Sequence, residues 1–326
     1  MPNTILLPLL ADGEFHSGQD LAAALGISRT AIWKQLNKLK GLGLEIESVK
    51  GRGYRIPDGI DLIDEAKVRS KMTAIGLSLL KELSIQELID STNMEALRRV
   101  EQGARSGLVC TAEQQTAGRG RRGREWISPF GRNLYVSTVW EFSQGAAALE
   151  GLSLAVGVAV ARALTDLGLP EVQLKWPNDI LYRGKKLGGV LLEMVGDASG
   201  QCQVVVGIGL NVAMPRSAAD SIDQAWTDVS LMAEGGVAPG RNELLGSLLG
   251  QLLPLLAAFE SDGFTPWREP WQSLDAHAGK SVILTTGNNK VAGIARGVDP
   301  RGALRLETSV GVESVFGGEI SLRIVE

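Results

Sequence analysis

The sequence predicts a multidomain α+β protein with an N-terminal winged helix-turn-helix, a central α/β domain and a C-terminal SH3-like β-barrel. Helix-capping residues and helical spacing dominate the first part of the chain. Strand-like and helix-like runs mix in the middle part, and only short strands separated by Gly, Asn or Asp occupy the last part. The 326 residues, 44% of them hydrophobic, suffice for two or three domains. We therefore expect domains at 1–61, 62–274 and 275–326.

Short helices are expected at the start of the first domain. Ser17 begins a helix that ends at Gly26, and Ser28 caps a second helix that runs to about Lys40. An apolar helix around residues 5–10 must precede them. Together these helices form a helix-turn-helix.

The outward face of the second helix, with the turn of a hairpin over 44–56, suits contact with nucleic acid. The side chains concerned are Ser28, Arg29, Thr30, Trp33, Lys34, Asn37 and Lys38 on the helix and Lys50 and Arg52 on the turn. Trp33 is unusual there, since DNA-reading helices more often present small polar or basic residues. It either packs on the sugar-phosphate backbone or is covered by Leu44. A winged helix can also serve for protein contacts alone, so both kinds of partner stay open.

Strands and helices alternate in the other two domains. Central strands are expected at 107–112, 134–140, 172–176, 190–194 and 204–210. Central helices are expected at 92–102, 149–167 and 242–259. The barrel strands are expected at 281–286, 291–298, 303–307, 312–316 and 320–324.

Composition narrows the classes of function. A net charge of −4 disfavours general polyanion binding, so any nucleic-acid contact needs a local basic patch. Cys110 and Cys202 lie in apolar runs and read as buried thiols. His16 and His277 lie far from every motif, which disfavours a zinc site. We see neither a signal-peptide pattern nor an apolar run long enough to span a membrane, so we expect a cytoplasmic protein without a membrane partner.

An arginine- and glycine-rich segment, QTAGRGRRGREW, occupies residues 115–126. Gly118, Gly120 and Gly123 match the dinucleotide pattern GxGxxG, but that fingerprint needs a helix at its third glycine, and here the chain runs on into a strand. We therefore reject a nicotinamide site. Four arginines on a flexible backbone repel one another until an anion arrives, so the segment suits closure over a phosphate-bearing ligand. The alternative is a solvated basic loop or a nucleic-acid patch.

A second cationic element follows the motif KWPND at 175–179. A hairpin then places Lys186 beside Gly188 and Gly189, where a ligand can approach the backbone closely. A lysine supplies a compact positive charge for a carboxylate or a phosphate. The alternative is an ordinary hairpin with a surface lysine.

Two polar segments have both a structural and a functional interpretation. In DSTN at 90–93, Ser91 or Thr92 caps a helix, or the small polar side chains and helix amides face a ligand. Asn211 ends an apolar strand, where it reads an adenine edge, contacts a phosphate or starts a turn.

Taken together, these motifs resemble one family, the bacterial bifunctional biotin–protein ligases and biotin-operon repressors. The family order is STN at 91–93, GRGRRGREW at 118–126, KWPND at 175–179, KLGG at 186–189 and GIGLN at 207–211. The winged helix and the small barrel complete the family's layout, so the resemblance spans nearly the whole chain.

The resemblance implies roles for individual residues. The implied biotin-binding residues are Ser91, Thr92, Asn93, Gln115, Gly118, Arg119, Gly120, Arg121, Lys186 and Gly189. The implied ATP- and adenylate-binding residues are Arg121, Trp126, Asn178, Lys186 and Asn211. Lys186, Arg121 and Arg119 are implied to carry the catalysis, and Asp179 either holds Mg²⁺ or positions the acceptor lysine.

The resemblance also implies a reaction and partners. ATP converts biotin to biotinyl-5′-AMP, and biotin then passes to a lysine of the biotin carboxyl carrier protein of acetyl-CoA carboxylase. An adenylate-bound homodimer represses at operator DNA. The residues suit this chemistry independently, because a carboxylate attacking a phosphate needs cations rather than a general base. A lipoate–protein ligase, or a ligand-sensing transcription factor without catalysis, is the alternative.

Overall fold

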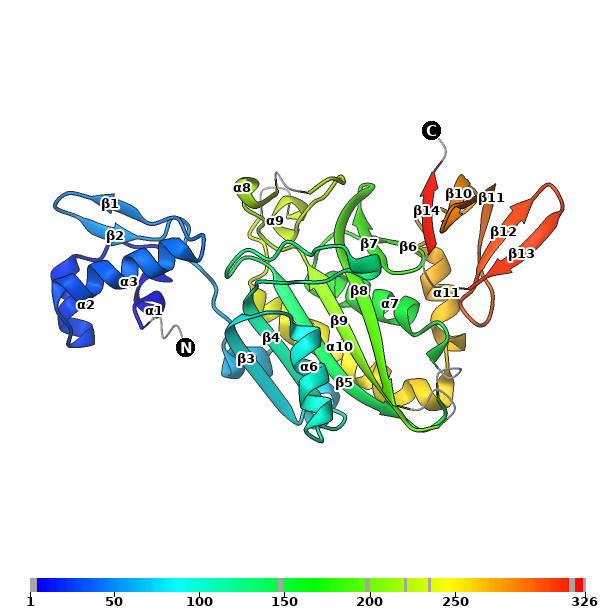
Figure 1. Cartoon of the computed structure of the whole chain (residues 1–326), viewed down its shortest axis with the longest axis horizontal. Coiled ribbons are helices and arrows are strands. Elements are labelled where there is room, and N and C mark those ends of the chain that lie inside the picture. Colours follow the sequence, from blue (N-terminus) through cyan, green and yellow to red (C-terminus); the bar gives the residue numbers. More distant parts are fainter. Residues whose placement is uncertain are drawn as a thin grey trace.

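The computed structural model places three units along one long axis (Figure 1). It describes residues 5–145, 149–196, 200–219, 222–233, 236–316 and 320–324. A helical unit with a β-hairpin lies at one end, a seven-stranded sheet with helices lies in the middle, and a five-stranded antiparallel sheet lies at the other end. The predicted fold class is confirmed.

The N-terminal unit has the predicted winged helix-turn-helix order. Its elements are α1 (Leu7–Leu10), α2 (Gly18–Leu25), α3 (Arg29–Gly41), β1 (Glu47–Val49) and β2 (Gly53–Arg55). The hydroxyl of Ser17 accepts the backbone N–H of Asp20, and that of Ser28 accepts the N–H of Ala31. Trp33 is 60% exposed while Leu44 is buried in the core, so Leu44 does not cover Trp33.

The central sheet has the strand order β3-β4-β5-β9-β8-β7-β6. Its strands are β3 (Glu82–Ile89), β4 (Leu108–Gln115), β5 (Leu134–Phe142), β6 (Gln173–Lys175), β7 (Asp179–Tyr182), β8 (Lys185–Gly196) and β9 (Cys202–Leu210). Only the β3–β4 pair is parallel among the described strand pairs of this sheet. Every predicted strand is present, and β3 and β7 are additional. Cys110 and Cys202 are buried free thiols, as predicted.

Helices cover both faces of this sheet (Figure 1). α6 (Thr92–Glu101) packs on β4, β5 and β9, while α7 (Leu152–Asp166) and α10 (Arg241–Asp262) pack together on the opposite face. Short helices complete the unit: α4 (Glu65–Ser70), α5 (Ala74–Leu79), α8 (Arg216–Ala219), α9 (Val229–Met232) and α11 (Thr265–Ser273). Gly157 lies inside α7 on its buried side, where a Cβ would meet the side chain of Leu174.

The sequence was expected to contain no apolar run long enough to span a membrane, and one helix departs from that expectation. Helix α10 has 22 residues and is long and apolar enough to cross a bilayer by length and composition alone. However, 61% of its apolar window is buried inside the protein. Its leucines pack against α7, α4 and α5, so the apolar composition reflects a core helix.

The C-terminal unit is an antiparallel sheet with the order β13-β12-β11-β10-β14. Its strands are β10 (Ser281–Thr286), β11 (Asn289–Val298), β12 (Leu304–Thr308), β13 (Gly311–Val315) and β14 (Ile320–Ile324). The indole N–H of Trp176 in KWPND donates to the carbonyl of Gly302 at 3.1 Å. This bond ties the C-terminal unit to the central one.

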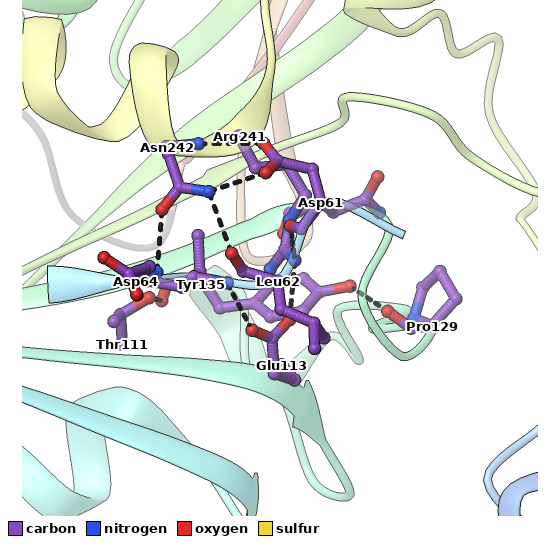
Figure 2. A network of polar contacts seen from close by, with 11 residues as sticks. Asp61, Leu62, Asp64, Thr111, Glu113, Pro129, Tyr135, Arg241 and Asn242 are labelled. Atoms are coloured by element: carbon purple, nitrogen blue, oxygen red, sulfur yellow. Dashed lines mark hydrogen bonds and ion pairs between the residues drawn. The ribbon is translucent and has the colours of Figure 1, made fainter. Parts of the chain in front are cut away.

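A buried polar network fixes the segment that follows the winged helix (Figure 2). Arg241 at the start of α10 donates to the carbonyl of Asp61 at 2.9 Å and forms an ion pair with Glu113 of β4. Glu113 in turn accepts the backbone N–H of Ile63 at 2.7 Å. Phe130 of the central unit lies in the same buried apolar cluster as the winged-helix core. The connection between the two units is therefore anchored on the central domain.

Candidate active site and nucleic-acid interface

The predicted motifs meet at one cavity of about 420 Å³ in the central unit. Its predicted lining residues are Ser91, Thr92, Asn93, Gln115, Arg119, Gly120, Arg121, Trp126, Asn178, Asp179, Lys186 and Gly189. They come from the start of α6, the end of β4, the arginine-rich loop, the β6–β7 turn and β8. Of the predicted ligand residues, Gly118 and Asn211 do not line this cavity.

The polar end of the cavity is formed by the start of α6. Ser91 makes no side-chain capping bond; instead the backbone N–H of Thr92 donates to Oε1 of Gln115 at 2.9 Å. Gln115 also donates from Nε2 to the hydroxyl of Ser128 at 3.1 Å. The interpretation of Ser91 as a side-chain cap was therefore wrong, and its side chain is left among the residues that line the cavity.

An ion pair behind this turn holds it in place. Arg98 of α6 donates to both carboxylate oxygens of Asp90 at 2.9 Å, and Asp90 accepts the N–H of Ser91 at 2.7 Å. The hydrogen bonds from Arg98 lower the pKa of Asp90 to about 2. Asp90 therefore stays ionised and keeps the polar turn in one conformation.

The arginine-rich loop closes on itself beside the cavity. A short 3₁₀ turn at Arg121–Gly123 separates its two arms. No α-helix begins at Gly123, so the GxGxxG pattern lacks the helix that a dinucleotide site needs. Gly118 lies at the base of the loop, where a Cβ would come within 2.6 Å of the carbonyl of Trp126. Gly118 thus permits the pairing of the two arms. The guanidinium of Arg121 donates to Oδ1 of Asn178 at 2.9 Å, and burial lowers the pKa of Arg121.

Cations gather around a single carboxylate on the far wall. Nζ of Lys186 lies 2.7 Å from Oδ1 of Asp179, and Nζ of Lys175 lies 3.6 Å from Oδ2 of the same group. The ring of Trp126 stands 5.6 Å from the Lys186 ammonium and packs on Gly209, where a Cβ would come within 2.5 Å of it. With Arg121 nearby, positive charge exceeds negative charge here, which suits a carboxylate meeting a phosphate.

Asp179 does not form a resident metal site with its neighbours. Among the residues that the structure describes, no group of three His, Cys, Asp or Glu side chains could hold a metal ion. The Asp179 carboxylate is also engaged by Lys186. A magnesium ion would therefore need most of its ligands from a bound phosphate.

Asn211 lies at a second, smaller cavity of about 130 Å³ on the other side of Lys186 and Trp126. Its side-chain amide donates to the carbonyl of Thr227 at 3.0 Å. Trp226 also lines this cavity. Residues predicted for the nucleotide therefore face two adjoining spaces that share Trp126 and Lys186.

The structure adds lining residues that sequence reasoning missed. Tyr135 and Arg323 line the main cavity, and Arg323 arrives from β14 of the C-terminal unit. Ser137 is fully buried and hydrogen-bonds to Asn93. Ser137 and the adjacent Thr138 interrupt the apolar run of β5, and this interruption was a signal that could have revealed the position.

The expectation that both histidines lie far from every motif was wrong for His277. Leu174 exchanges backbone hydrogen bonds with Leu274 and Ala276 at 2.7 and 2.9 Å, which brings this segment against the KWPND strand. His277 is 5% exposed, and burial, aided by the charge of Lys175, lowers the pKa of His277 to about 4. A neutral imidazole therefore lies beside the cationic wall.

The predicted nucleic-acid surface is accessible throughout. Ser28, Arg29, Thr30, Trp33, Lys34, Asn37, Lys38, Lys50 and Arg52 are all exposed. The guanidinium of Arg52 stacks on Phe15, 4.1 Å from the ring centre, which fixes the direction of this wing residue. The α3 face and the hairpin turn thus present basic groups outward.

Known proteins match each unit of the chain. The model of the HTH domain matches residues 3–55, that of the biotin/lipoate A/B protein ligase family matches 85–211, and that of the biotin protein ligase C terminal domain matches 277–323. The biotin protein ligase from Aquifex aeolicus, solved in complex with biotin and ATP, is 30% identical. It aligns with a TM-score of 0.63 and covers 76% of this chain and 100% of its own.

Two curated relatives match almost from end to end. The bifunctional ligase/repressor BirA of Salmonella typhimurium is 42% identical over 321 residues, which are 98% of this chain and 97% of the relative. The protein of the same name from Bacillus subtilis is 32% identical over 313 residues, or 96% and 95% of the two chains. The chain therefore belongs to the family of bifunctional biotin–protein ligases and biotin-operon repressors.

Proposed function

We propose that this chain activates biotin with ATP and transfers it to a lysine of an acceptor protein, the biotin carboxyl carrier protein of acetyl-CoA carboxylase. The observation that carries the proposal is the cavity in which the polar turn at 91–93 faces the cations Arg121 and Lys186. A carboxylate oxygen of biotin attacks the α-phosphorus of ATP, the bond to the β-phosphate breaks, and pyrophosphate leaves. The acceptor amine then attacks the acyl carbon, AMP leaves, and the amine proton passes to solvent.

Each part of the cavity has a role in this proposal. Ser91, Thr92, Asn93 and Gln115 bind the ureido ring, while Lys186, Arg119 and Arg121 neutralise the carboxylate and the α-phosphate. Gly120 and Gly189 let the ligand approach the backbone closely, and Gly118 lets the two arms of the loop pair beside it. Trp126, Asn178 and Asn211 serve the nucleotide. Magnesium enters as the ATP complex, and Asp179, which contacts Lys186, is a candidate protein ligand for it; otherwise Asp179 receives the acceptor lysine.

The winged helix is proposed to make the chain an operator-binding repressor that acts as a homodimer. The exposed basic groups on α3 and the hairpin turn support major-groove and phosphate contacts. In this proposal residues 1–61 bind DNA, residues 62–274 carry the ligase, and residues 275–326 contribute Arg323 to the cavity.

Biotin-dependent exchange of labelled pyrophosphate into ATP tests the ligase. The protein is incubated with ATP and pyrophosphate, with biotin, with lipoate or with neither. Exchange with biotin is the expected result. Exchange with lipoate alone would identify a lipoate ligase, and the absence of exchange in all three arms would leave a ligand-sensing transcription factor.

A further inference from the structure

Asn93 is held at both ends of its side-chain amide. Its Nδ2 donates to Oε2 of Glu193 on β8 at 2.6 Å, and its Oδ1 accepts from the hydroxyl of Ser137 on β5 at 2.5 Å. The amide lies close against Gly207 of β9, where a Cβ would come within 2.2 Å of Oδ1. Any larger residue at 207 would displace this amide.

The chemistry of Glu193 decides which end of the amide faces which neighbour. An ionised carboxylate only accepts hydrogen bonds, so the NH₂ group of Asn93 must face Glu193 and the oxygen must face Ser137. The amide oxygen cannot donate, so Ser137 must direct its one proton to Asn93. The hydroxyl oxygen of Thr92 lies 2.8 Å from that of Ser137 and is drawn into the same chain of hydrogen bonds.

The direction of these hydrogen bonds decides which atoms face the cavity, because Thr92 and Asn93 line the cavity and Glu193 does not. We infer that Glu193 is a positioning residue for the ureido ring of biotin: it orients Asn93 so that acceptor oxygens, rather than amide hydrogens, meet the ring N–H groups. This inference rests on the proposed biotin ligase function. Glu193 contacts Asn93 and does not itself line the cavity, so in this inference it acts only on recognition of the ring.

The Glu193→Gln variant keeps the shape of the side chain but lets it donate as well as accept. Asn93 then loses its single orientation. We expect the KM for biotin in pyrophosphate exchange, and the Kd for biotin by calorimetry, to rise about tenfold, the loss of roughly one hydrogen bond to a charged group. The KM for ATP should stay within about twofold of the wild-type value. Glu101→Gln, at the exposed end of α6, is the matched control and should change neither constant.

A second pair of variants separates orientation from general damage. Asn93→Asp places two carboxylates at the 2.6 Å contact and should weaken biotin binding strongly. When Glu193→Gln is added, the new glutamine amide donates a hydrogen bond to one oxygen of the aspartate at 93. The other oxygen of that aspartate still accepts from Ser137. The double variant should therefore bind biotin more tightly than Asn93→Asp alone.

Three results would overturn the inference: an unchanged Kd for biotin in Glu193→Gln, equal rises in the KM for biotin and for ATP, or a double variant no better than Asn93→Asp. Failure of the proposed function would look different. In that case the wild-type protein itself would show no biotin-dependent exchange.

Discussion

Glu113 of β4 and Arg241 of α10 form an ion pair at 2.5 Å whose side chains are only 6% and 4% exposed. Glu113 precedes by two residues Gln115, which binds the start of α6 at the cavity. Both partners also hold the backbone that leads to the winged helix, through Ile63 and Asp61 (Figure 2). One buried pair therefore joins the strand that carries Gln115, the longest described helix and the interdomain connection.

Arg241→Met should destabilise the protein by about 3–5 kcal/mol, because it leaves the Glu113 carboxylate buried without its partner. Lys71→Met is the control: Lys71 pairs with Glu243 at 2.9 Å, but the two side chains are 50% and 38% exposed, so its loss should cost less than about 1 kcal/mol. Urea unfolding measures both free energies. Equal losses would show that burial does not set the strength of this pair.

The free energy of unfolding should depend on pH through the protonation of His277. Its pKa is about 4 in the folded protein and 6.5 when unperturbed, so the unfolded chain takes up the proton first as the pH falls. The contribution of His277 to the free energy of unfolding is therefore largest above pH 6.5 and decreases toward about pH 4, by up to roughly 3 kcal/mol. His277→Phe should lose less stability than the wild type over this range. Parallel curves for the two proteins would contradict the assignment.

The sequence predicts elements whose stabilising contacts are local. The caps at Ser17 and Ser28 bond to backbone three residues away, so the ends of α2 and α3 are encoded in a short stretch. Strand β3 was missed because its residues Glu82–Ile89 lack strict alternation and lie at the edge of the sheet. Its pairing with β4 is a tertiary contact that no local pattern reports.

In the candidate site, too, the sequence predicts residues of local motifs but not residues that tertiary contacts bring together. The motif residues at 91–93, 119–121 and 186 were predicted, and the structure brings them to one cavity. Arg323, which lines the cavity, and His277, whose segment lies against the KWPND strand, were missed because they reach these places only when the C-terminal unit packs on the central one. Ser137 and Glu193 were missed because their partner Asn93 lies more than forty residues away in the chain.

Lys186→Ala should reduce the rate of adenylate formation by on the order of a hundredfold or more, because it removes a cation shared by the attacking carboxylate and the α-phosphate. Lys185→Ala removes the exposed neighbouring lysine and should leave the rate within about twofold of the wild type. Single-turnover measurement of biotin- and ATP-dependent pyrophosphate release compares them. Near-normal adenylation by Lys186→Ala would show that this lysine is structural.

Arg121→Gly should weaken retention of the adenylate more than its formation. The guanidinium lies over the cavity and bonds to Asn178, so its loss opens the loop side of the site while Lys186 remains. The released mixed anhydride should then acylate lysines of unrelated proteins, which a streptavidin blot of added albumin detects. Complete loss of adenylate synthesis would instead place Arg121 mainly in the first step.

Adenylate binding should promote self-association through the open half of β8. On the side away from β9, the backbone N–H and carbonyl of Val190 still bond to Asn178, each at 2.9 Å. Beyond Val190, β8 pairs with β9 along one side, and the described residues show no strand along the other. An open strand edge can pair with its counterpart in a second chain. A ligand that orders the arginine-rich loop lowers the conformational entropy that association must overcome. Of the expected edge, 190–194, residues 191–194 thus remain a candidate for the contact.

Sedimentation with and without a non-hydrolysable adenylate analogue measures this coupling. We expect a mostly monomeric free protein whose association constant rises with the analogue, and linkage requires the dimer to bind the analogue more tightly by the same factor. Met194 on β8 is 40% exposed, and Met194→Lys should weaken the liganded dimer while biotin-dependent pyrophosphate exchange persists, because a charge on an open edge opposes strand pairing. An association constant that the analogue leaves unchanged would refute the switch, and the ligase proposal would stand without it.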